Sequence, residues 1–147
     1  MSIYLLDINL LVALFWTNHE QHEAAASWFR ALRTSEWATC PITQAGFVRV
    51  SSNPRVFADA PSPGKALEVL EENLRHARHR FWQDDIAFAD AVAPFAGLLK
   101  GYQQVTDAYL FGLAVRKGGV LATFDAGIAA LAEAKSGCLK SIQILKA

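Results

Sequence analysis

The run IYLLD, residues 3–7, consists of four apolar residues followed at once by an aspartate. Apolar runs of this length are typical of strands that are buried on both faces of a parallel sheet. A run of similar form, VLATFD at residues 120–125, also ends in an aspartate. In open α/β sheets, sites form beyond the carboxyl ends of the strands. The two runs therefore predict a buried parallel sheet with Asp7 and Asp125 at the same edge.

The rest of the chain alternates between strand and helix patterns. We expect further strands at about residues 37–40, 80–82 and 141–144, and helices at about residues 9–16, 20–33, 43–52, 63–74, 87–96, 105–117 and 127–135. This alternation favours a three-layer α/β/α fold around a central parallel sheet of four or five strands. The chain contains no repeat, low-complexity tract or linker, so residues 1–147 are expected to form a single domain.

Composition limits the class of protein. Hydrophobic residues make up 52% of the chain, and 14 Lys and Arg balance 14 Asp and Glu. This excludes a disordered chain and a generally basic surface, so any contact with nucleic acid has to be local. The only cysteines, Cys40 and Cys138, are too few for a zinc site and are expected to be buried thiols. The chain starts without a signal-peptide pattern, and its apolar run at residues 10–16 is too short for a bilayer, so we expect a cytoplasmic protein with no membrane segment.

A third carboxylate reaches the same edge of the sheet by way of a helix. Helical spacing places Asp107 on one stripe with Leu110 and Phe111, and this stripe faces the core because it is apolar. An inward-facing carboxylate needs compensation. The helix dipole offers about 0.3–1 kcal/mol at an exposed site, and a cation would offer much more. The same spacing turns Gln44 inward near the start of its own helix, where the neutral amide lends only an oxygen or N–H donors.

Three carboxylates in one pocket repel one another unless a positive charge lies among them. Mg²⁺ is held through one or two carboxylates and water, which leaves positions for substrate phosphates. The chemistry that such a site predicts is hydrolysis of a phosphate ester. Ordinary structural roles stay open for each residue: Asp7 suits a helix cap, Asp107 a first-turn acid and Asp125 a turn.

Around these residues the chain resembles a known family. The segments LLDINLL at residues 5–11, VTDAYL at residues 105–110 and ATFD at residues 122–125 are similar to the signature segments of PIN-domain ribonucleases. The closest likeness is to the VapC toxins of bacterial toxin–antitoxin pairs. A mycobacterial-type branch of that group is matched by HEQH at residues 19–22, by Trp28-Phe29 and by TQAGFVRVSSNP at residues 43–54. Each motif alone is common, but their order and spacing together are specific.

The resemblance implies a toxin that cuts RNA internally, depends on Mg²⁺ or Mn²⁺, forms a homodimer and is neutralised by a VapB-type antitoxin. It implies that Asp7 and Asp107 are the main metal ligands and that Asp125 completes the pocket, directly or through water. The residues expected to support this site are Asn9, Gln44 and Thr106.

One position departs from the family pattern, which often has a glutamate where this chain has Gln44. The loss of that acid leaves an alternative function open, namely a catalytically weakened PIN-like scaffold that binds an antitoxin or RNA without cutting. A phosphorylated receiver domain and a haloacid-dehalogenase phosphatase are disfavoured, because the first strand leads to Asp7-Ile8-Asn9 without a second acid. The candidates for a substitute fourth acid are Asp84, Asp85 and Asp90.

For two further features of the sequence, a structural and a functional interpretation both remain open. Asn9 either caps the helix that follows the first strand or orders water or phosphate in the site. The basic stretch with Arg75, Arg78 and Arg80 either contacts RNA phosphates or complements the dipole at a helix end.

Overall fold

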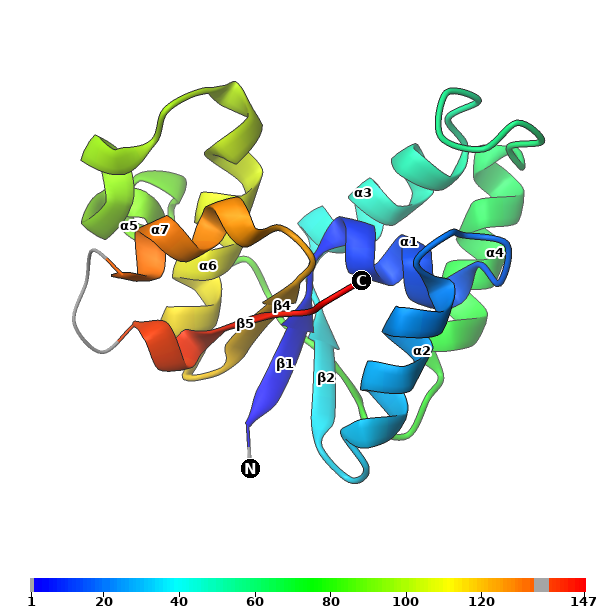
Figure 1. Cartoon of the computed structure of the whole chain (residues 1–147), viewed down its shortest axis with the longest axis horizontal. Helices are drawn as coiled ribbons and strands as arrows, with labels where there is room; N and C mark the ends of the chain where they lie inside the picture. Colours follow the sequence, from blue (N-terminus) through cyan, green and yellow to red (C-terminus); the bar gives the residue numbers. More distant parts are fainter. Residues whose placement is uncertain (1, 134–137) are drawn as a thin grey trace.

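The computed structural model describes residues 2–133 and 138–147 and has three layers, with a sheet between two groups of helices (Figure 1). The strands pair in parallel throughout, in the order β3-β2-β1-β4-β5. They are β1 (Ile3–Leu6), β2 (Glu36–Thr39), β3 (His79–Phe81), β4 (Val120–Thr123) and β5 (Ile142–Ile144). The predicted α/β/α fold with a parallel sheet of four or five strands is confirmed.

The helices follow the predicted alternation. They are α1 (Ile8–Phe15), α2 (His22–Ala31), α3 (Pro41–Ser51), α4 (Pro63–Leu74), α5 (Phe88–Val92), α6 (Val105–Lys117) and α7 (Ala129–Glu133), with short 3₁₀ helices η1 (Ala93–Leu98), η2 (Tyr102–Gln104), η3 (Ala126–Ile128) and η4 (Leu139–Ser141). The helix predicted at residues 87–96 is divided between α5 and η1, because Pro94 has no N–H with which to continue an α-helix. The helix predicted at residues 127–135 corresponds to the end of η3 and to α7, and its residues 134 and 135 lie outside the described part of the chain.

Successive residues of the central strands enter two different cores. Leu5 and Leu121 pack with residues of α5 and α6, whereas Leu6 and Ala122 pack with residues of α1, α3 and α4. Side chains alternate between the faces of a strand, so a strand that helices cover on both faces has to be apolar throughout (Figure 1). The unbroken apolar runs at β1 and β4 reflect this double burial.

Two glycines allow helices to approach one another closely. A Cβ on Gly46 of α3 would lie 2.3 Å from Cδ1 of Ile8, at the start of α1. A Cβ on Gly112 of α6 would lie 2.1 Å from the carbonyl oxygen of Ala91 in α5. The absence of a side chain at Gly46 therefore lets the first turns of α3 lie against the residue that follows Asp7.

Two smaller predictions concern the thiols and the membrane. Cys40 is buried, Cys138 is half-buried, and both are free thiols. None of the helices in the described part of the chain is long and apolar enough to cross a membrane.

Candidate active site

Asp7 follows β1 directly and caps the amino end of α1. Its Oδ1 accepts a hydrogen bond from the backbone N–H of Leu10 at 2.8 Å, and its Oδ2 accepts one from the hydroxyl of Thr123. The backbone N–H of Asp7 donates to the carbonyl of Ala122 at 3.1 Å. The cap that the sequence left as an alternative role is present, and it fixes a side chain that is only 4% exposed at the carboxyl edge of the sheet.

The charge of Asp7 is poorly solvated. Burial raises the pKa of Asp7 from 3.8 to about 7, against the hydrogen bonds from Thr123 and Leu10, and the negative charges of Asp107 and Asp125 add to the rise. A positive charge at this place would act in the opposite direction and favour the ionised carboxylate.

Asp107 and Asp125 reach the same edge from other elements. Asp107 lies in the first turn of α6 and is half-buried, and burial together with the charge of Asp125 raises the pKa of Asp107 to about 6. Asp125 follows β4 and is exposed, and its Oδ1 accepts a hydrogen bond from the backbone N–H of Gly127 at 2.8 Å. The structure therefore brings together the three aspartates that the sequence singled out, close enough for their charges to interact.

Thr123 links two of these aspartates and was not singled out from the sequence. Its hydroxyl donates to Asp7, and its oxygen accepts the backbone N–H of Asp125 at 2.9 Å. Thr123 is 1% exposed at the last position of β4. A hydroxyl residue at the carboxyl end of an otherwise apolar strand was the available signal.

The three supporting residues are placed less closely to this cluster. Asn9 is exposed inside α1, which Asp7 caps, so the interpretation of Asn9 as the cap is wrong. Thr106 is exposed beside Asp107. Gln44, in the first turns of α3, donates from its amide Nε2 to Thr39 Oγ1 at 3.0 Å, so this hydrogen bond goes to β2 and not to an aspartate.

The candidates for a substitute acid lie elsewhere. Asp85 pairs with Lys117 at 3.2 Å. Asp84 lies near Tyr109: burial raises the pKa of Tyr109, and the charge of Asp84 adds to this rise. Asp90 lines a separate cavity. None of the three is among the charges that raise the pKa of Asp7 or Asp107, so the cluster has three acids from the described part of the chain.

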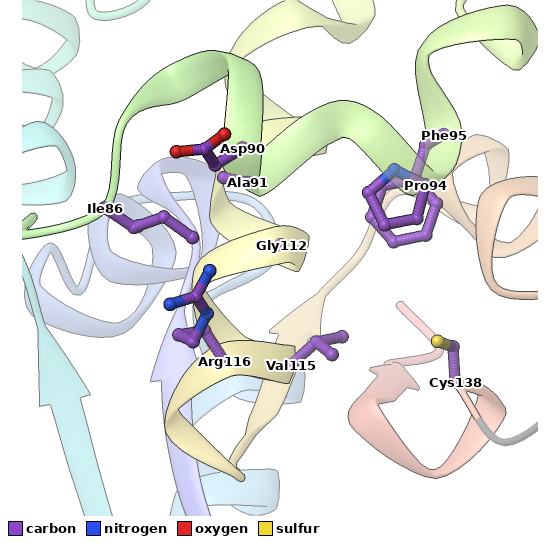
Figure 2. Close-up of a pocket in the computed structure, with 9 residues that line it drawn as sticks. All are labelled: Ile86, Asp90, Ala91, Pro94, Phe95, Gly112, Val115, Arg116 and Cys138. Atoms are coloured by element: carbon purple, nitrogen blue, oxygen red, sulfur yellow. The ribbon is translucent and has the colours of Figure 1, made fainter.

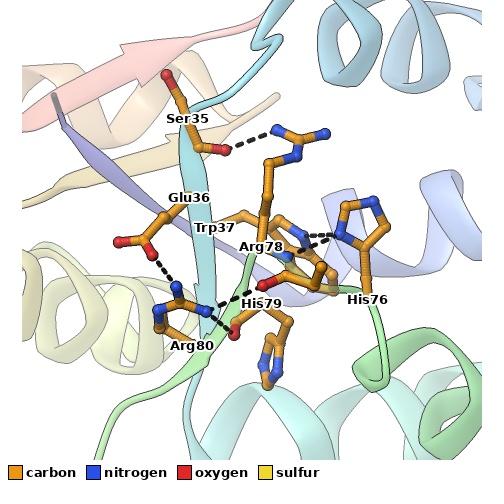
Figure 3. Close-up of polar contacts among 8 residues, drawn as sticks. Ser35, Glu36, Trp37, His76, Arg78, His79 and Arg80 are labelled. Atoms are coloured by element: carbon orange, nitrogen blue, oxygen red, sulfur yellow. Dashed lines mark hydrogen bonds and ion pairs between the residues drawn. The ribbon is translucent and has the colours of Figure 1, made fainter.

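Side chains of the basic stretch connect β3 to β2 through hydrogen bonds and an ion pair (Figure 3). Arg78 donates to the carbonyl oxygen of Ser35 at 2.6 Å, and its guanidinium lies 5.3 Å from the centre of the Phe29 ring. Arg80 pairs with Glu36 and donates to the carbonyl oxygen of its own neighbour His79 at 2.9 Å. Residues 35, 36 and 78 lie at the amino ends of these parallel strands, opposite the edge that carries Asp7. Arg75 is exposed at the end of α4. These contacts favour the structural interpretation of the stretch.

A cavity of about 160 Å³ lies beside α6, between α5, η1 and Cys138 (Figure 2). Its walls are mostly apolar, and Asp90 and Arg116 lie on one side of it while Cys138 lies on the other. Gly112 and Val115 face it from α6, one to two turns beyond Asp107. None of the three clustered aspartates lines this cavity, so it is separate from the candidate active site.

The donor set of the cluster fits a hard divalent cation. No group of three or more His, Cys, Asp or Glu side chains converges as a ready-made metal cage within residues 2–133 and 138–147. Mg²⁺ is ordinarily held through one or two carboxylates and several waters and does not need such a cage. The raised pKa values of Asp7 and Asp107 mark a place where a cation would favour both ionised carboxylates.

The fold and the edge carboxylates together define a PIN domain, and the family model for the PIN domain matches residues 4–134. The chain belongs to the VapC ribonucleases of that family. It is 49% identical over 129 residues to Ribonuclease VapC38 of Mycobacterium tuberculosis, a match that covers 88% of this chain and 89% of that protein. It is 43% identical over 130 residues to Ribonuclease VapC39 of the same species, covering 88% and 94%.

Two solved structures share the fold. One is VapBC2 from Rickettsia felis bound to a DNA fragment from the promoter, with a TM-score of 0.67 and 14% identity over 98% of this chain and 99% of that chain. The other is FitAcB from Neisseria gonorrhoeae, with a TM-score of 0.57 and 21% identity over 88% and 93%. At these identities the likeness concerns the fold alone.

Proposed function

We propose that this chain is a metal-dependent endoribonuclease, the toxin of a type II toxin–antitoxin pair, in which Asp7, Asp107 and Asp125 hold Mg²⁺ or Mn²⁺. The observation that carries the proposal is the meeting of these carboxylates at one sheet edge, where burial and mutual repulsion raise the pKa of Asp7 and Asp107. Membership of the VapC ribonucleases supports the choice of RNA as substrate. Residues 1–147 act as one domain in this proposal.

The three aspartates differ in how firmly their carboxylates are held and in how exposed they are. Hydrogen bonds from Leu10 and Thr123 fix the carboxylate of Asp7, so this side chain would offer the cation a ligand in one set position. The Oδ1 of Asp125 is engaged with Gly127 while its exposed side chain leaves the other oxygen open to water. Asp107 is half-buried on the first turn of α6, where the helix dipole also favours its charge. When bound, the cation supplies charge neutralisation at the phosphate oxygens and lowers the pKa of a hydrolytic water.

The residues of this chain then have three tasks. Asp7 and Asp107 hold the cation at the carboxyl edge of the sheet, and Thr123 keeps Asp7 from rotating. The exposed Asp125 completes the pocket on the solvent side, directly or through water.

The proposal includes two partners of the chain. One is a VapB-type antitoxin, supported by the VapC relatives and by the fold shared with VapBC2 of Rickettsia felis. The other is a second copy of the chain in a homodimer. Expression of the chain alone is expected to arrest growth, and co-expression with the antitoxin is expected to restore it.

Cleavage of RNA by the purified chain tests the enzyme. We expect cleavage with Mg²⁺ that is lost in the presence of a chelator and falls at least 100-fold in Asp7→Asn, since that substitution removes the best-fixed carboxylate charge. Asp59→Asn, which alters an exposed aspartate in a loop, is the matched control and should cleave normally. Undiminished cleavage by Asp7→Asn would remove the basis of the proposal.

A second function, a scaffold that binds without cutting, is favoured by one observation: Gln44 is neutral and bonds to Thr39. Gln44→Glu separates the two functions. A large gain from near-zero cleavage supports the scaffold, whereas a small change supports the active enzyme.

A further inference from the structure

The carboxylates lie on one face of the sheet as well as at one edge. Side chains alternate along a strand, so Asp7 points to the same face as Leu5, two residues earlier. Leu5 packs in the core to which residues of α5 and α6 belong. Thr123, which donates to Asp7, and Asp107, in the first turn of α6, lie on the same side. A residue of another element that acts at this site therefore has to reach this face.

One stripe of α3 turns toward that face. Ile42, in the first turn of α3, packs against the same core as Leu5. Arg49 follows Ile42 by seven residues, which is nearly two full turns of an α-helix, so the two share a stripe. At a rise of about 1.5 Å per residue, Arg49 lies about 10 Å further along the helix axis. Because α3 extends beyond the carboxyl ends of β1 and β2, this stripe places Arg49 above the edge that carries the carboxylates (Figure 1).

Small residues occupy this stripe between its two ends. They are Ala45 and Gly46. A Cβ on Gly46 would lie 2.3 Å from Ile8, the residue that follows Asp7, so the stripe passes close to the amino end of α1. No long side chain of α3 stands on this stripe between Arg49 and that helix end.

The guanidinium of Arg49 has no partner within the described part of the chain. The side chain is exposed, and none of the ion pairs among the described residues includes it, whereas Arg30 and Arg80 both pair with glutamates. Arg49 is also not among the charges that shift the pKa of Asp7 or Asp107, so it does not take the place of the cation. The side chain is therefore a positive charge beside the acidic cluster that is free to bind a ligand.

We propose that Arg49 binds a backbone phosphate of the RNA substrate, next to the phosphate that the cation holds, and so keeps the strand across the carboxylates. This inference rests on the proposed function. A guanidinium donates two parallel hydrogen bonds to phosphate oxygens. An RNA strand has a phosphate at every nucleotide, so a strand bound at the cation brings further phosphates beside it, whereas the acids of a protein partner have no fixed spacing. A phosphate contact reads no base, so Arg49 is expected to act alike on RNAs of different sequence.

Binding of a single-stranded oligoribonucleotide, followed by fluorescence anisotropy at several salt concentrations, tests the inference. The Asp7→Asn background prevents cleavage during the measurement. In that background Arg49→Gln is expected to weaken binding about ten-fold near physiological salt and to reduce the slope of log affinity against log salt by about 0.7, the share of one phosphate on a single strand. Arg49→Lys keeps the charge and should keep the slope, but it loses the two parallel hydrogen bonds and should bind about three-fold more weakly.

The matched control is Arg75→Gln, which removes another exposed arginine at the end of α4. The chain passes from α4 to the amino end of β3, so Arg75 lies at the edge of the sheet opposite the carboxylates. Its RNA affinity and its salt slope should equal those of the parent. Equal reductions of the slope in Arg75→Gln and Arg49→Gln would mean that any surface arginine contributes, and would overturn the inference. An unchanged slope in Arg49→Gln would overturn it as well.

Steady-state cleavage by Arg49→Gln in the otherwise unaltered chain provides an independent readout. A phosphate that does not react is bound equally in the substrate complex and in the transition state, so KM for RNA should rise about ten-fold with kcat within about two-fold. Calorimetry on the RNA-free protein should show an unchanged affinity for Mg²⁺. A fall in kcat alone, or weaker Mg²⁺ binding, would mean that Arg49 acts on the metal site and would overturn the inference. Arg49→Lys provides the second variant if Arg49→Gln fails to fold.

Failure of the inference is distinguishable from failure of the proposed function. If cleavage requires Mg²⁺ and Asp7 while Arg49→Gln binds and cleaves RNA like the parent, only the inference is refuted. If Arg49→Gln keeps its RNA affinity but loses binding of a poly-glutamate peptide that the parent binds, the arginine serves a protein partner and the inference is again refuted alone. If the unaltered protein binds no Mg²⁺ and cleaves no RNA, the proposed function is refuted and the inference with it.

Discussion

Replacement of Asp7 by asparagine is expected to stabilise the protein in chelating buffer even though it removes activity. Burial raises the pKa of Asp7 from 3.8 to about 7. This shift of about 3 units, at about 1.4 kcal/mol per unit, means that ionisation of Asp7 opposes folding by up to about 4 kcal/mol. A bound cation would offset this cost, because a nearby positive charge favours the ionised form of Asp7.

The sign of the pH dependence of stability follows from which state, folded or unfolded, binds the proton of Asp7 more tightly. The folded chain binds the proton of Asp7 more tightly than the unfolded chain, so stability falls as the pH rises from the unfolded pKa of 3.8 to the folded pKa of about 7 and stays low above it. Asparagine carries no charge, keeps an acceptor for the N–H of Leu10 and can donate to Thr123. The advantage of Asp7→Asn should therefore be below about 1 kcal/mol at pH 4 and about 2–4 kcal/mol at pH 8, the lower value allowing for one rearranged hydrogen bond.

Urea unfolding in EDTA at pH 4, 6 and 8, followed by tryptophan fluorescence, measures this difference. Asp59→Asn, at an exposed loop position, is the control and should match the parent at every pH. Addition of Mg²⁺ at pH 8 should stabilise the parent and leave Asp7→Asn unchanged. If Asp7→Asn is no more stable than the parent at pH 8, or if its advantage does not grow with pH, then burial does not destabilise the ionised carboxylate of Asp7 and the reasoning is refuted.

Three other substitutions test other parts of the structure. Gly112→Ala places a methyl group against the carbonyl of Ala91 and should reduce the free energy of unfolding by about 1–3 kcal/mol in urea, and an unchanged midpoint would contradict the close approach of α5 and α6. Thr123→Val removes the hydroxyl that holds Asp7 and should lower kcat at least ten-fold with little change in KM for RNA, whereas a change in KM alone would argue against that role. Arg78→Ala should lower stability by about 1–2 kcal/mol but leave the salt dependence of RNA binding unaltered, and a reduced salt slope would restore the interpretation of a phosphate contact.

The fold was predictable because its central strands are unambiguous. Residues 3–6 and 120–123 are apolar throughout, apart from the threonine that ends the second run, and only a strand covered on both faces requires this. The prediction of one helix at residues 87–96 was less accurate. The apolar spacing there is regular, but Pro94 interrupts the backbone hydrogen bonds, so the segment is divided between α5 and η1. Spacing reports which face is buried and does not report which backbone groups can pair.

The positions of Asp7 and Asp125 were predictable for a related reason, since the end of a strand is visible in the sequence and the strands are parallel, whereas the position of Asp107 was predictable from the apolar stripe of its helix. The contacts of the basic stretch were not. Arg78 and Arg80 are set against Ser35 and Glu36 by the pairing of β3 with β2, which brings together residues about 43 positions apart in the chain. A local pattern of positive charge contains no information about that pairing.

Register explains why Thr123 was missed although Asp7 was found. Leu6 pairs with Ala122, so the next residue on each strand, Asp7 and Thr123, come side by side on the same face. A register shifted by one residue would turn Thr123 to the opposite face and leave Asp7 with Leu10 as its only fixed donor. The sequence specifies that a carboxylate ends one strand and that a hydroxyl ends another. Only the hydrogen bonds between β1 and β4 determine that the two meet, and the ability of this edge to hold a fixed carboxylate depends on that meeting.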